Sequence, residues 1–389
     1  MPEALLASIR RWAGELGFDH CRALRVSEAP HWDFFRQWLD RGNAAGMAYL
    51  ERGAAARRSP AALVLPGQAP LQTLLVLSVD YRQFALPAAV RDDPARGLIA
   101  SYAWGEDYHE LIRPQLNALD QRIRAATGRQ QAGRGFVDAG PVLERDFAEA
   151  SGLAFTGKNC MSIVPGAGSQ CFLATLAIPE LLPADPGALT EAAAPTPDAV
   201  LAGLPGRTHL GVQRLPQAAV GTCGHCTRCL VACPTGAFVG PLHLDARRCI
   251  AYWTIETQDL APVELLPGFG NRIFGCDICQ EVCPWNHRLA PRPVRLPGLR
   301  ARDAWVAPPL LEGFQVGTPY WLDDAAFAQR FRRSAVKRAK RSGMLRNVCV
   351  ALGNWGDPRG RTALESALST VSPAVQQAAR WALGRLREG

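Results

Sequence analysis

The residues best suited to chemistry are closely spaced cysteines in the second half of the chain. Cys223, Cys226, Cys229 and Cys233 follow the spacing C-x2-C-x2-C-x3-C, and Pro234 comes directly after them. Thiolates at this spacing hold a [4Fe–4S] cluster, and the fourth cysteine normally binds a second cluster. The spacing therefore predicts an iron–sulfur module whose second cluster needs further cysteines from elsewhere in the chain.

A second set of cysteines can supply the missing ligands. Cys276, Cys279 and Cys283 repeat the back of the pattern, and Cys249 replaces the cysteine lost at Ile273. The crossed arrangement of two-cluster ferredoxins predicts that one cluster is bound by Cys223, Cys226, Cys229 and Cys283. It assigns to the other cluster Cys233, Cys249, Cys276 and Cys279. Paired C-x2-C segments also bind structural zinc, but zinc does not require three cysteines at two-residue gaps followed by Cys-Pro.

Length and composition indicate a soluble protein of two or three domains. The chain has 389 residues, of which 48% are hydrophobic, and one domain usually takes about 100–200 residues. No stretch approaches the roughly 18 apolar residues of a membrane span, and residues 1–19 show helical spacing rather than a signal peptide. We expect a cytoplasmic protein without membrane contact, in which clustered cysteines bind metal. We expect the scattered cysteines to be small buried residues, namely Cys21, Cys160, Cys171 and Cys349.

Positive charge is concentrated near the C-terminus. The net charge is +8. Residues 325–356 contain no Asp or Glu but carry Arg330, Arg332, Arg333, Lys337, Arg338, Lys340, Arg341 and Arg346. A solvated helix face normally mixes both signs, whereas a block of one sign is typical of surfaces that bind nucleic-acid phosphates. The block therefore favours a nucleic-acid partner over an ordinary solvated face.

Helical and strand-like patterns alternate in the first half of the chain. Apolar residues at helical spacing predict helices over 32–39 and 108–127, and short apolar runs predict strands over 71–79 and 170–178. Such interleaving argues for an α/β domain. Residues 182–207 are rich in Pro, Ala and Gly, which indicates an insertion or linker.

The second half of the chain divides into the cysteine module and a helical tail. We expect a helix over 245–256 within the module and a Pro-rich boundary at 290–298. Four short helices are expected in the tail, over 327–341, 345–353, 361–370 and 374–387, and they suggest a pair of HEAT-like repeats. The predicted domains are 1–207, 208–300 and 301–389.

Several longer segments carry a family resemblance. They are YAWGEDYH (102–109), VDAGPVLER (137–145), SGLAFTGKN (151–159), LDARRCIAYWTIE (244–256), GNRIFGCD (270–277), GCDICQEVCPWN (275–286) and LRNVCVALGN (345–354). Through these segments, which follow one another over nearly the whole chain, the sequence resembles the epoxyqueuosine reductase family.

The resemblance implies a cobalamin-dependent oxidoreductase with two [4Fe–4S] clusters. The family reduces epoxyqueuosine to queuosine at the wobble position of the tRNAs for Asp, Asn, His and Tyr, which is the last step of queuosine biosynthesis. The implied fold is a multidomain α+β or α/β arrangement. It comprises an α/β cobalamin-binding domain, a ferredoxin-like two-cluster domain and an all-α HEAT-like tail. The implied partners are a tRNA anticodon stem-loop and an external low-potential electron donor, and we expect a monomer.

The resemblance also implies a proton donor at Asp138. Removing the epoxide oxygen takes two electrons and two protons, and a general acid is needed because oxide or hydroxide is a poor leaving group. A free Asp has a pKa of about 3.9, so we expect burial in a low-dielectric pocket, against corrin and base, to raise the pKa of Asp138. Without the resemblance, an Asp before Ala-Gly-Pro would be read as a turn residue.

Further site residues follow from the matched segments. Base-off cobalamin is expected to contact Arg57, Tyr102, Asp138, Lys158, Asn159, Ser162, Ala251 and Asp277. Asp277 lies beside Cys276, so electrons are expected to pass from the donor to the Cys223 cluster, then the Cys276 cluster, then cobalt. The expected phosphate contacts of the tRNA are Arg332, Arg333, Lys337, Arg338, Lys340 and Arg341, and those near the modified base are Thr254 and Glu256.

Other interpretations fit parts of the sequence. Asp107-Tyr108-His109 is similar to the start of the cobalamin-ligating motif D-x-H-x-x-G, but residue 112 is Ile, so we expect His109 to have a capping and packing role. A corrinoid reductive dehalogenase would share both cofactors, but it has no use for the basic tail. A non-catalytic electron carrier or tRNA-binding module would take up no corrin.

Overall fold

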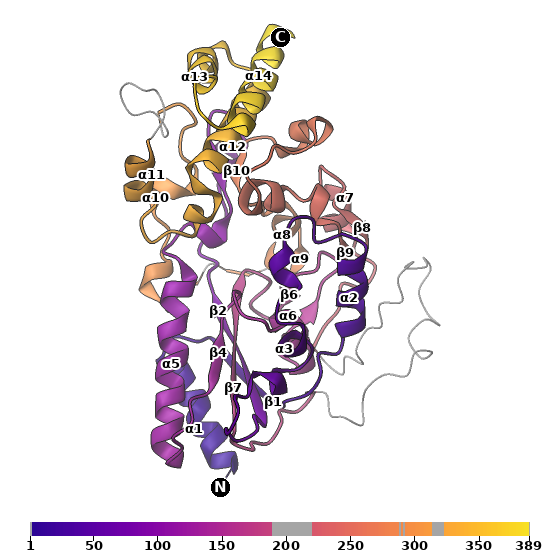
Figure 1. The fold of residues 1–389 in the computed structure, drawn as a ribbon, viewed down its shortest axis with the longest axis vertical. Helices are drawn as coiled ribbons and strands as arrows, with labels where there is room; N and C mark the ends of the chain where they lie inside the picture. The colour runs from indigo at the N-terminus through magenta and orange to yellow at the C-terminus, as the bar shows by residue number, and fades with distance from the viewer. Residues whose placement is uncertain (1, 189–219, 288, 291, 313–322, 389) are drawn as a thin grey trace.

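The structure is a computed structural model that describes residues 2–188, 220–287, 289–290, 292–312 and 323–388. The chain is elongated, with the N-terminus near one end of its long axis and the C-terminal helices at the other (Figure 1). The expected linker at 182–207 lies outside the described residues from position 189 onward. None of the helices in the described ranges combines the length and the hydrophobicity that a bilayer crossing requires.

A four-stranded sheet forms the centre of the N-terminal half. Its strand order is β1-β2-β7-β4, with β1 at His20–Arg25, β2 at Thr73–Asp80, β7 at Cys171–Ile178 and β4 at Arg134–Phe136. Every neighbouring pair is antiparallel. The strands expected at 71–79 and 170–178 are therefore confirmed as β2 and β7, within a mixed fold whose main sheet is antiparallel.

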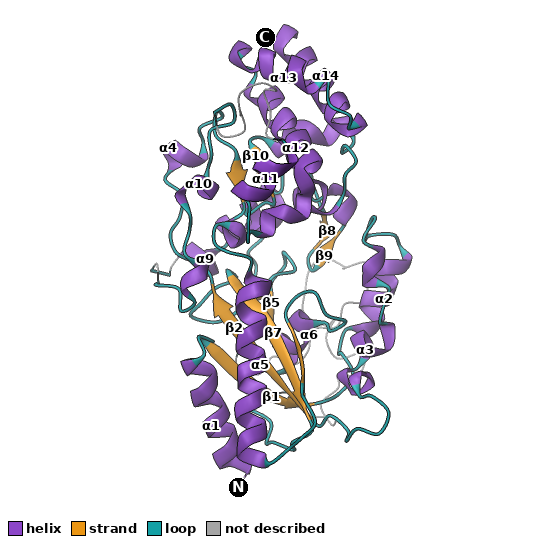
Figure 2. Cartoon of the chain, turned by 60° about the vertical axis from the view of Figure 1, so that its left-hand side comes forward, coloured by secondary structure: helices purple, strands orange, loops and turns teal. Residues whose placement is uncertain are grey.

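Helices cover both faces of this sheet. One face is covered by α1 (Pro2–Glu15) and α5 (Tyr108–Thr127), and the other side carries α2 (Trp32–Asp40), α3 (Ala54–Arg58) and α6 (Glu144–Ala150), as Figures 1 and 2 show. The helices expected at 32–39 and 108–127 are thus confirmed. Asp107 caps α5 by accepting the His109 backbone N–H (3.0 Å), and Gly128 ends the helix at a φ of 74°.

The unbroken apolar run of β2 follows from this layering. Leu75 and Leu77 belong to the core that includes α1 and α5, whereas Leu74 and Val76 belong to the core that includes α6. Successive side chains of a strand point to opposite faces. A strand covered on both faces therefore needs apolar residues at every position, as the sequence of β2 has.

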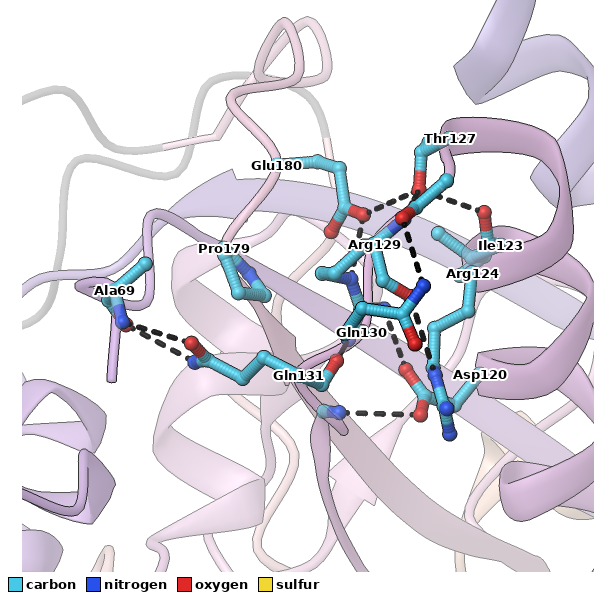
Figure 3. Close-up of polar contacts among 12 residues, drawn as sticks. Ala69, Asp120, Ile123, Arg124, Thr127, Arg129, Gln130, Gln131, Pro179 and Glu180 are labelled. Atoms are coloured by element: carbon cyan, nitrogen blue, oxygen red, sulfur yellow. Dashed lines mark hydrogen bonds and ion pairs between the residues drawn. The ribbon is translucent and has the colours of Figure 1, made fainter. Parts of the chain in front are cut away.

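A buried ion-pair cluster joins the end of α5 to the end of β7 (Figure 3). Arg129 lies 2.6 Å from Asp120 and 2.6 Å from Glu180, and all three side chains are at most 13% exposed. Gln131 then binds the backbone of Ala69, in the segment before β2. The cluster fixes three separate segments at the edge of the sheet.

The cysteine module consists of short elements. They are α7 (Arg228–Ala232), β8 (Phe238–Gly240), β9 (His243–Leu244), a 3-10 helix (Ala246–Arg248), a π-helical segment (Tyr252–Glu256), β10 (Arg272–Phe274), α8 (Ile278–Glu281) and α9 (Pro284–His287). The single helix expected over 245–256 is wrong. Cys249 is extended, with a φ of −78° and a ψ of 127°, and it separates the 3-10 helix from the segment that follows.

The tail contains α10 (Asp303–Val306), α11 (Asp324–Arg330), a 3-10 helix (Ala335–Ala339), α12 (Lys340–Trp355), α13 (Arg361–Ala367) and α14 (Pro373–Glu388). The last two match the helices expected at 361–370 and 374–387, and α12 contains the one expected at 345–353. The helix expected over 327–341 is wrong, because Arg333 and Lys340 adopt left-handed φ values of 60° and 57°. The HEAT-like arrangement stays a prediction.

The remaining elements are small. They are α4 (Ala88–Arg91), β3 (Leu98–Ile99), β5 (Phe155–Thr156), β6 (Ser162–Ile163) and 3-10 helices at Ala48–Leu50, Pro60–Leu63, Ser101–Ala103, Val263–Phe269, Pro297–Leu299 and Pro358–Gly360. β3 pairs in parallel with β10, so an N-terminal segment adds a strand to the cysteine module.

The tail shares its hydrophobic core with earlier parts of the chain. Buried residues of α12 and α14 pack in one cluster with residues 98–104 and 250–274. Arg346 of α12 is buried and donates to the backbone carbonyls of Trp253, Thr257 and Asp259. Asn347 donates to the carbonyls of Thr254 and Ile273. The predicted domain boundary near 300 is therefore not a boundary between cores, and the one near 207 lies outside the described residues.

Candidate active site and cluster-binding module

Four of the predicted cluster cysteines lie together beside α7. Burial, together with the nearby Cys223, Cys283 and Cys226 thiols, raises the pKa of the Cys229 thiol to about 11. The backbone N–H of Lys158 donates to Cys223 Sγ at 3.4 Å. The structure thus brings together the set that the crossed arrangement assigns to the first cluster.

The other four cysteines form a second group. Burial raises the pKa of Cys279 well above its ordinary value, and Cys276 and Cys249 add to this effect. Cys249 in turn interacts with Cys233. The two groups are adjacent, since Cys229 also acts on Cys279. Each group therefore contains cysteines from both sequence segments, which is the crossed arrangement.

The spread of these thiols differs from a site for one ion. Among the described residues, no three His, Cys, Asp or Glu side chains form a group that could hold a single metal ion. Structural zinc draws four ligands onto one atom at about 2.3 Å, whereas a four-iron cube binds each cysteine at a separate corner.

A cavity of about 740 Å³ lies between the N-terminal sheet and the cysteine module. Cys249, Cys276 and Cys279 of the second group line it. It is also lined by every predicted cobalamin contact except Lys158, namely Arg57, Tyr102, Asp138, Asn159, Ser162, Ala251 and Asp277. Segments far apart in the sequence therefore meet at one site, which we call the active-site cavity.

Lys158 does not line this cavity. Its ammonium donates to the carbonyl oxygens of Gly224 (2.8 Å) and Cys226 (2.9 Å), in the loop of the first cysteine group. The predicted cobalamin contact is corrected accordingly. The positive charge of Lys158 lies instead next to the loop that holds the first group.

Several of the predicted contacts are fixed by hydrogen bonds. Asn159 donates from Nδ2 to the Cys279 carbonyl (3.1 Å), which ties the cavity wall to the second cysteine group. Asp277 is buried, and its Oδ2 accepts the Ser101 backbone N–H at 2.6 Å. Burial raises the pKa of Asp277. These two side chains position the wall next to the cysteines.

Asp138 lies at the rim of the active-site cavity. Its φ of 54° is left-handed, a conformation that Asp and Asn tolerate better than most residues. Oδ2 accepts a hydrogen bond from the Tyr108 hydroxyl. The side chain is 69% exposed, so the protein alone covers Asp138 on one side only, and its expected burial against corrin and base stays a prediction.

Tyr108 and His109 are site residues that the sequence patterns did not indicate. His109 Nε2 lies 3.8 Å from Asp138 Oδ2, and His109 Nδ1 lies 2.8 Å from Asp107. The rings of Tyr108 and His109 stack with centroids 4.1 Å apart. The capping role of this segment is confirmed for Asp107, but both aromatic residues also face Asp138. The sequence feature that could have indicated Tyr108 and His109 is the DYH segment at the start of α5.

The cavity contains buried polar atoms that lack partners. Ser162 Oγ and Glu144 Oε1 make no hydrogen bond within the described part of the chain. Burial and, to a lesser extent, the nearby Asp138 raise the pKa of Glu144 to about 8. Buried polar atoms are nearly always paired, so unpaired ones call for an explanation such as a bound group. With the apolar lining, they fit a large cofactor that carries amide groups.

The basic tail reaches the rim of the same cavity. Arg338 binds Glu256 through two hydrogen bonds of 2.8 and 2.6 Å, and its guanidinium lies 5.6 Å from the ring centre of Tyr49. Tyr49 lines the cavity. Asp138 acts electrostatically on Arg338. Glu256, expected near the modified base, is thus engaged in an ion pair at the rim.

Other predicted tRNA contacts differ in their exposure and partners. Arg333 lies 2.8 Å from Glu106, so acids from other segments neutralise part of a stretch that has none of its own. Thr254 is fully buried, donates to the Ile250 carbonyl (2.7 Å) and accepts from Gly275 (2.9 Å), so its side chain is not available to a base in this structure. Arg332, Arg333, Lys337, Arg338 and Lys340 are exposed, and Arg341 is partly buried.

The scattered cysteines largely follow expectation. Cys349 is buried, and although Cys21, Cys160 and Cys171 are partly exposed as whole residues, burial raises the pKa of each of their thiols. Cys160 and Cys171 also line the active-site cavity. No sequence spacing indicated that these two residues would lie there.

Comparison with known proteins identifies the family. Residues 222–286 match the 4Fe-4S double cluster binding domain, and residues 57–139 match the profile described as epoxyqueuosine reductase QueG, DUF1730. Epoxyqueuosine reductase of Pseudomonas aeruginosa is 36% identical over 390 residues, which cover 99% of this chain and 95% of the relative. The Escherichia coli K12 enzyme is 34% identical, with 98% and 89% covered. The chain belongs to the epoxyqueuosine reductase family.

Solved structures of epoxyqueuosine reductases share the fold. One holds a tRNA-Tyr epoxyqueuosine-modified stem loop, is 25% identical and has a TM-score of 0.80, with 99% of this chain and 91% of that chain covered. The Streptococcus thermophilus structure has a TM-score of 0.77 at 24% identity, with 99% and 90% covered. As a family member, the chain is an oxidoreductase with a domain for two [4Fe–4S] clusters.

Proposed function

We propose that the chain reduces epoxyqueuosine to queuosine at the wobble position of the tRNAs for Asp, Asn, His and Tyr. The observation that carries this proposal is the active-site cavity, where Asp138 and three cysteines of the second group line one space. A proton donor and an electron source are both needed to remove an epoxide oxygen. Residues that could serve both needs line the same cavity, which supports this proposal.

The cluster ligands follow the two cysteine groups. Cys223, Cys226, Cys229 and Cys283 would bind the first cluster, and Cys233, Cys249, Cys276 and Cys279 the second. The second cluster would face the active-site cavity, because Cys249, Cys276 and Cys279 line it. The first would receive electrons from the donor.

Base-off cobalamin is the proposed cofactor of the cavity. When bound, it supplies a strongly reducing cobalt centre to the substrate. Arg57, Tyr102, Asn159 and Asp277 would hold it, and its amide groups would meet the unpaired atoms of Ser162 and Glu144. Ala251 would contribute a small apolar surface on the same wall.

Asp138 is the proposed proton donor. The Tyr108 hydroxyl holds one of its oxygens at the rim. A base that enters the cavity would cover the exposed side of Asp138, and such loss of solvent raises the pKa of a carboxyl group. The reaction consumes two electrons and two protons and releases water, so Asp138 must be protonated again in each cycle. His109 is close enough to serve that step.

The tRNA would bind across the rim and the tail. A solved relative holds an epoxyqueuosine-modified stem loop, and single-stranded loop bases can be turned outward into a pocket. In this chain Arg332, Lys337 and Lys340 are exposed, without a side-chain partner in the described part of the chain. Free cations of this kind bind phosphates.

The test is conversion of the nucleoside. Protein loaded with both clusters and cobalamin is given a strong reductant and tRNA that contains epoxyqueuosine, and digested nucleosides are analysed by mass spectrometry. We expect queuosine to appear. Unchanged epoxyqueuosine, with both clusters intact by iron content and absorption, would contradict the proposal.

A further inference from the structure

A second cavity of about 950 Å³ lies against the cysteine module, and no residue lines both cavities. We call it the cluster-side cavity. Its walls come from α7, α8, the start of β10, the end of α12 and the segment that follows α4. The proposed reaction uses the active-site cavity and leaves this one without a role.

The cluster-side cavity lies close to both groups of cysteines. Its lining residues Thr227 and Arg228 stand between Cys226 and Cys229 in the sequence, and Glu281 stands between Cys279 and Cys283. Arg272, also in the lining, acts electrostatically on Cys276. A molecule seated here would touch the helices that carry the proposed cluster ligands.

The surface of this cavity has the character of a protein interface. Val231 on α7 is 82% exposed, although it belongs to a cluster-bearing helix. Ile278, Val282 and Trp355 extend the apolar lining around it. An apolar centre with an aromatic residue, surrounded by charged residues, is typical of protein–protein interfaces. A single exposed Val is not unusual by itself. Val231, however, is part of an apolar lining, so its exposure fits a surface that binds a partner.

The charge around the cavity favours an acidic partner. Arg91 pairs with Asp92 at 2.8 Å, which neutralises one of the two acids in the lining. The other acid is Glu281, and the lining also contains Arg228 and Arg272. Arg228 is exposed, and no ion pair within the described ranges engages it or Arg272. The positive charge therefore exceeds the negative charge.

The wall opposite α7 is held in place. Asn354, at the end of α12, donates from Nδ2 to the carbonyls of Leu266 and Gly270, both at 2.9 Å. Trp355 follows directly, and Arg359 covers its ring at 4.9 Å. A preformed wall lowers the ordering cost of binding a partner.

We propose that the cluster-side cavity docks the electron donor, a small acidic protein that carries one electron at a time. The proposal rests on the proposed function, because only a reductase with clusters needs such a donor. In each docking the carrier is oxidised by one electron and one cluster is reduced by one electron. Two dockings supply the two electrons that, with two protons, convert the epoxide to an alkene and water.

The experiment measures electron transfer to the clusters without tRNA or cobalamin. Cluster-loaded protein is mixed rapidly with reduced flavodoxin, and cluster reduction is followed by absorption. Arg228→Glu is the test variant, and Val231→Gln changes the apolar centre without adding charge. Arg25→Glu, on an exposed position of β1, is the matched control. Dithionite serves as a small reductant that needs no docking site.

We expect Arg228→Glu to lower the second-order rate constant with flavodoxin on the order of tenfold at low salt, because attraction becomes repulsion. Val231→Gln should lower it by about threefold through lost apolar contact. Reduction by dithionite should be unchanged in both, and Arg25→Glu should match the unmodified protein. The proposal is overturned if flavodoxin reduces the clusters of Arg228→Glu as fast as those of the unmodified protein. It is also overturned if the substitution slows cluster reduction by flavodoxin and by dithionite to the same extent. Because this measurement uses no tRNA, its result is independent of the nucleoside-conversion test, and failure of the docking proposal can be told apart from failure of the proposed function.

Discussion

The Tyr108 hydroxyl donates a hydrogen bond to Asp138, whose backbone is in the left-handed region. The same Tyr108 ring stacks between His109 and Phe172, at 4.1 Å from each. A rigid, buried donor thus holds an exposed acid at the rim of the active-site cavity. The position of Asp138 therefore depends on Tyr108 as well as on its own loop.

Asp138→Asn should retain cobalamin but lose turnover. The amide cannot donate the same proton, and general acid catalysis typically contributes about 10²–10⁴-fold. Asn also tolerates the left-handed backbone, so the fold should be unchanged. Cobalamin binding is measured by absorption titration and turnover by nucleoside analysis. Full activity of Asp138→Asn would place the acid elsewhere.

Tyr108→Phe should reduce turnover by about tenfold, since a group that only positions the acid contributes less than the acid itself. The ring contacts with His109 and Phe172 are kept, so the thermal midpoint should change little. Adding Tyr108→Phe to Asp138→Asn should cause no further loss if the hydroxyl acts through Asp138. An additional tenfold loss in the double variant would show an independent role.

Stability should fall as the pH rises through the titration of Glu144. Its pKa is raised from 4.5 to about 8, so between these values the folded protein holds a proton that the unfolded chain has released. Stability from this group is therefore complete below 4.5 and is lost as the pH passes 8. Cofactor-free Glu144→Gln should show a shallower decline of the thermal midpoint over this range. If the thermal midpoints of Glu144→Gln and the unmodified protein fall in parallel over this pH range, the decline does not come from Glu144.

Arg129→Ala should destabilise the fold by about 3–5 kcal/mol, because it leaves buried charges unpaired. Asp120 and Glu180 would lose the partner that lies 2.6 Å from each (Figure 3). Arg36→Ala is the control, since its pair with Asp40 is exposed and such pairs contribute about 0–1 kcal/mol. Denaturant unfolding measures both, and equal midpoints for the two variants would show that the Arg129 cluster adds little.

Removing exposed charges of the tail should weaken tRNA binding and its salt dependence. Lys337→Ala should reduce the slope of log affinity against log salt by about 0.7–0.9 if Lys337 neutralises one phosphate. Arg333→Ala is the matched control, because Arg333 is already paired with Glu106. Fluorescence anisotropy with a labelled stem-loop at several salt concentrations measures both. A larger effect of Arg333→Ala would indicate that its ion pair opens on binding.

Local sequence signals predicted local structure well. Asp107 and Gly128 mark the ends of α5, and both act through neighbouring backbone groups. The cysteine spacings likewise predicted two groups that the fold brings together. Cap residues and short spacings are properties of adjacent residues, so one sequence is enough to read them.

Long-range contacts were the source of the errors. The acid-free tail appeared uniformly basic, but Glu106 and Glu256 come from distant segments to pair with Arg333 and Arg338. Thr254 is buried by contacts with Gly275, which nothing in its own segment indicates. How far the protein itself covers Asp138 likewise depends on which distant segments surround the cavity, and the neighbouring residues of Asp138 do not indicate them.

The contacts of Arg346 and Asn347 bear on the order of events during synthesis. These residues hold the carbonyls of residues 253, 254, 257 and 259, directly after Cys249. They are translated after all eight cysteines of the two groups. The backbone that follows Cys249 therefore gains these hydrogen bonds only after α12 has been synthesised, and a product cut short before residue 346 would lack them.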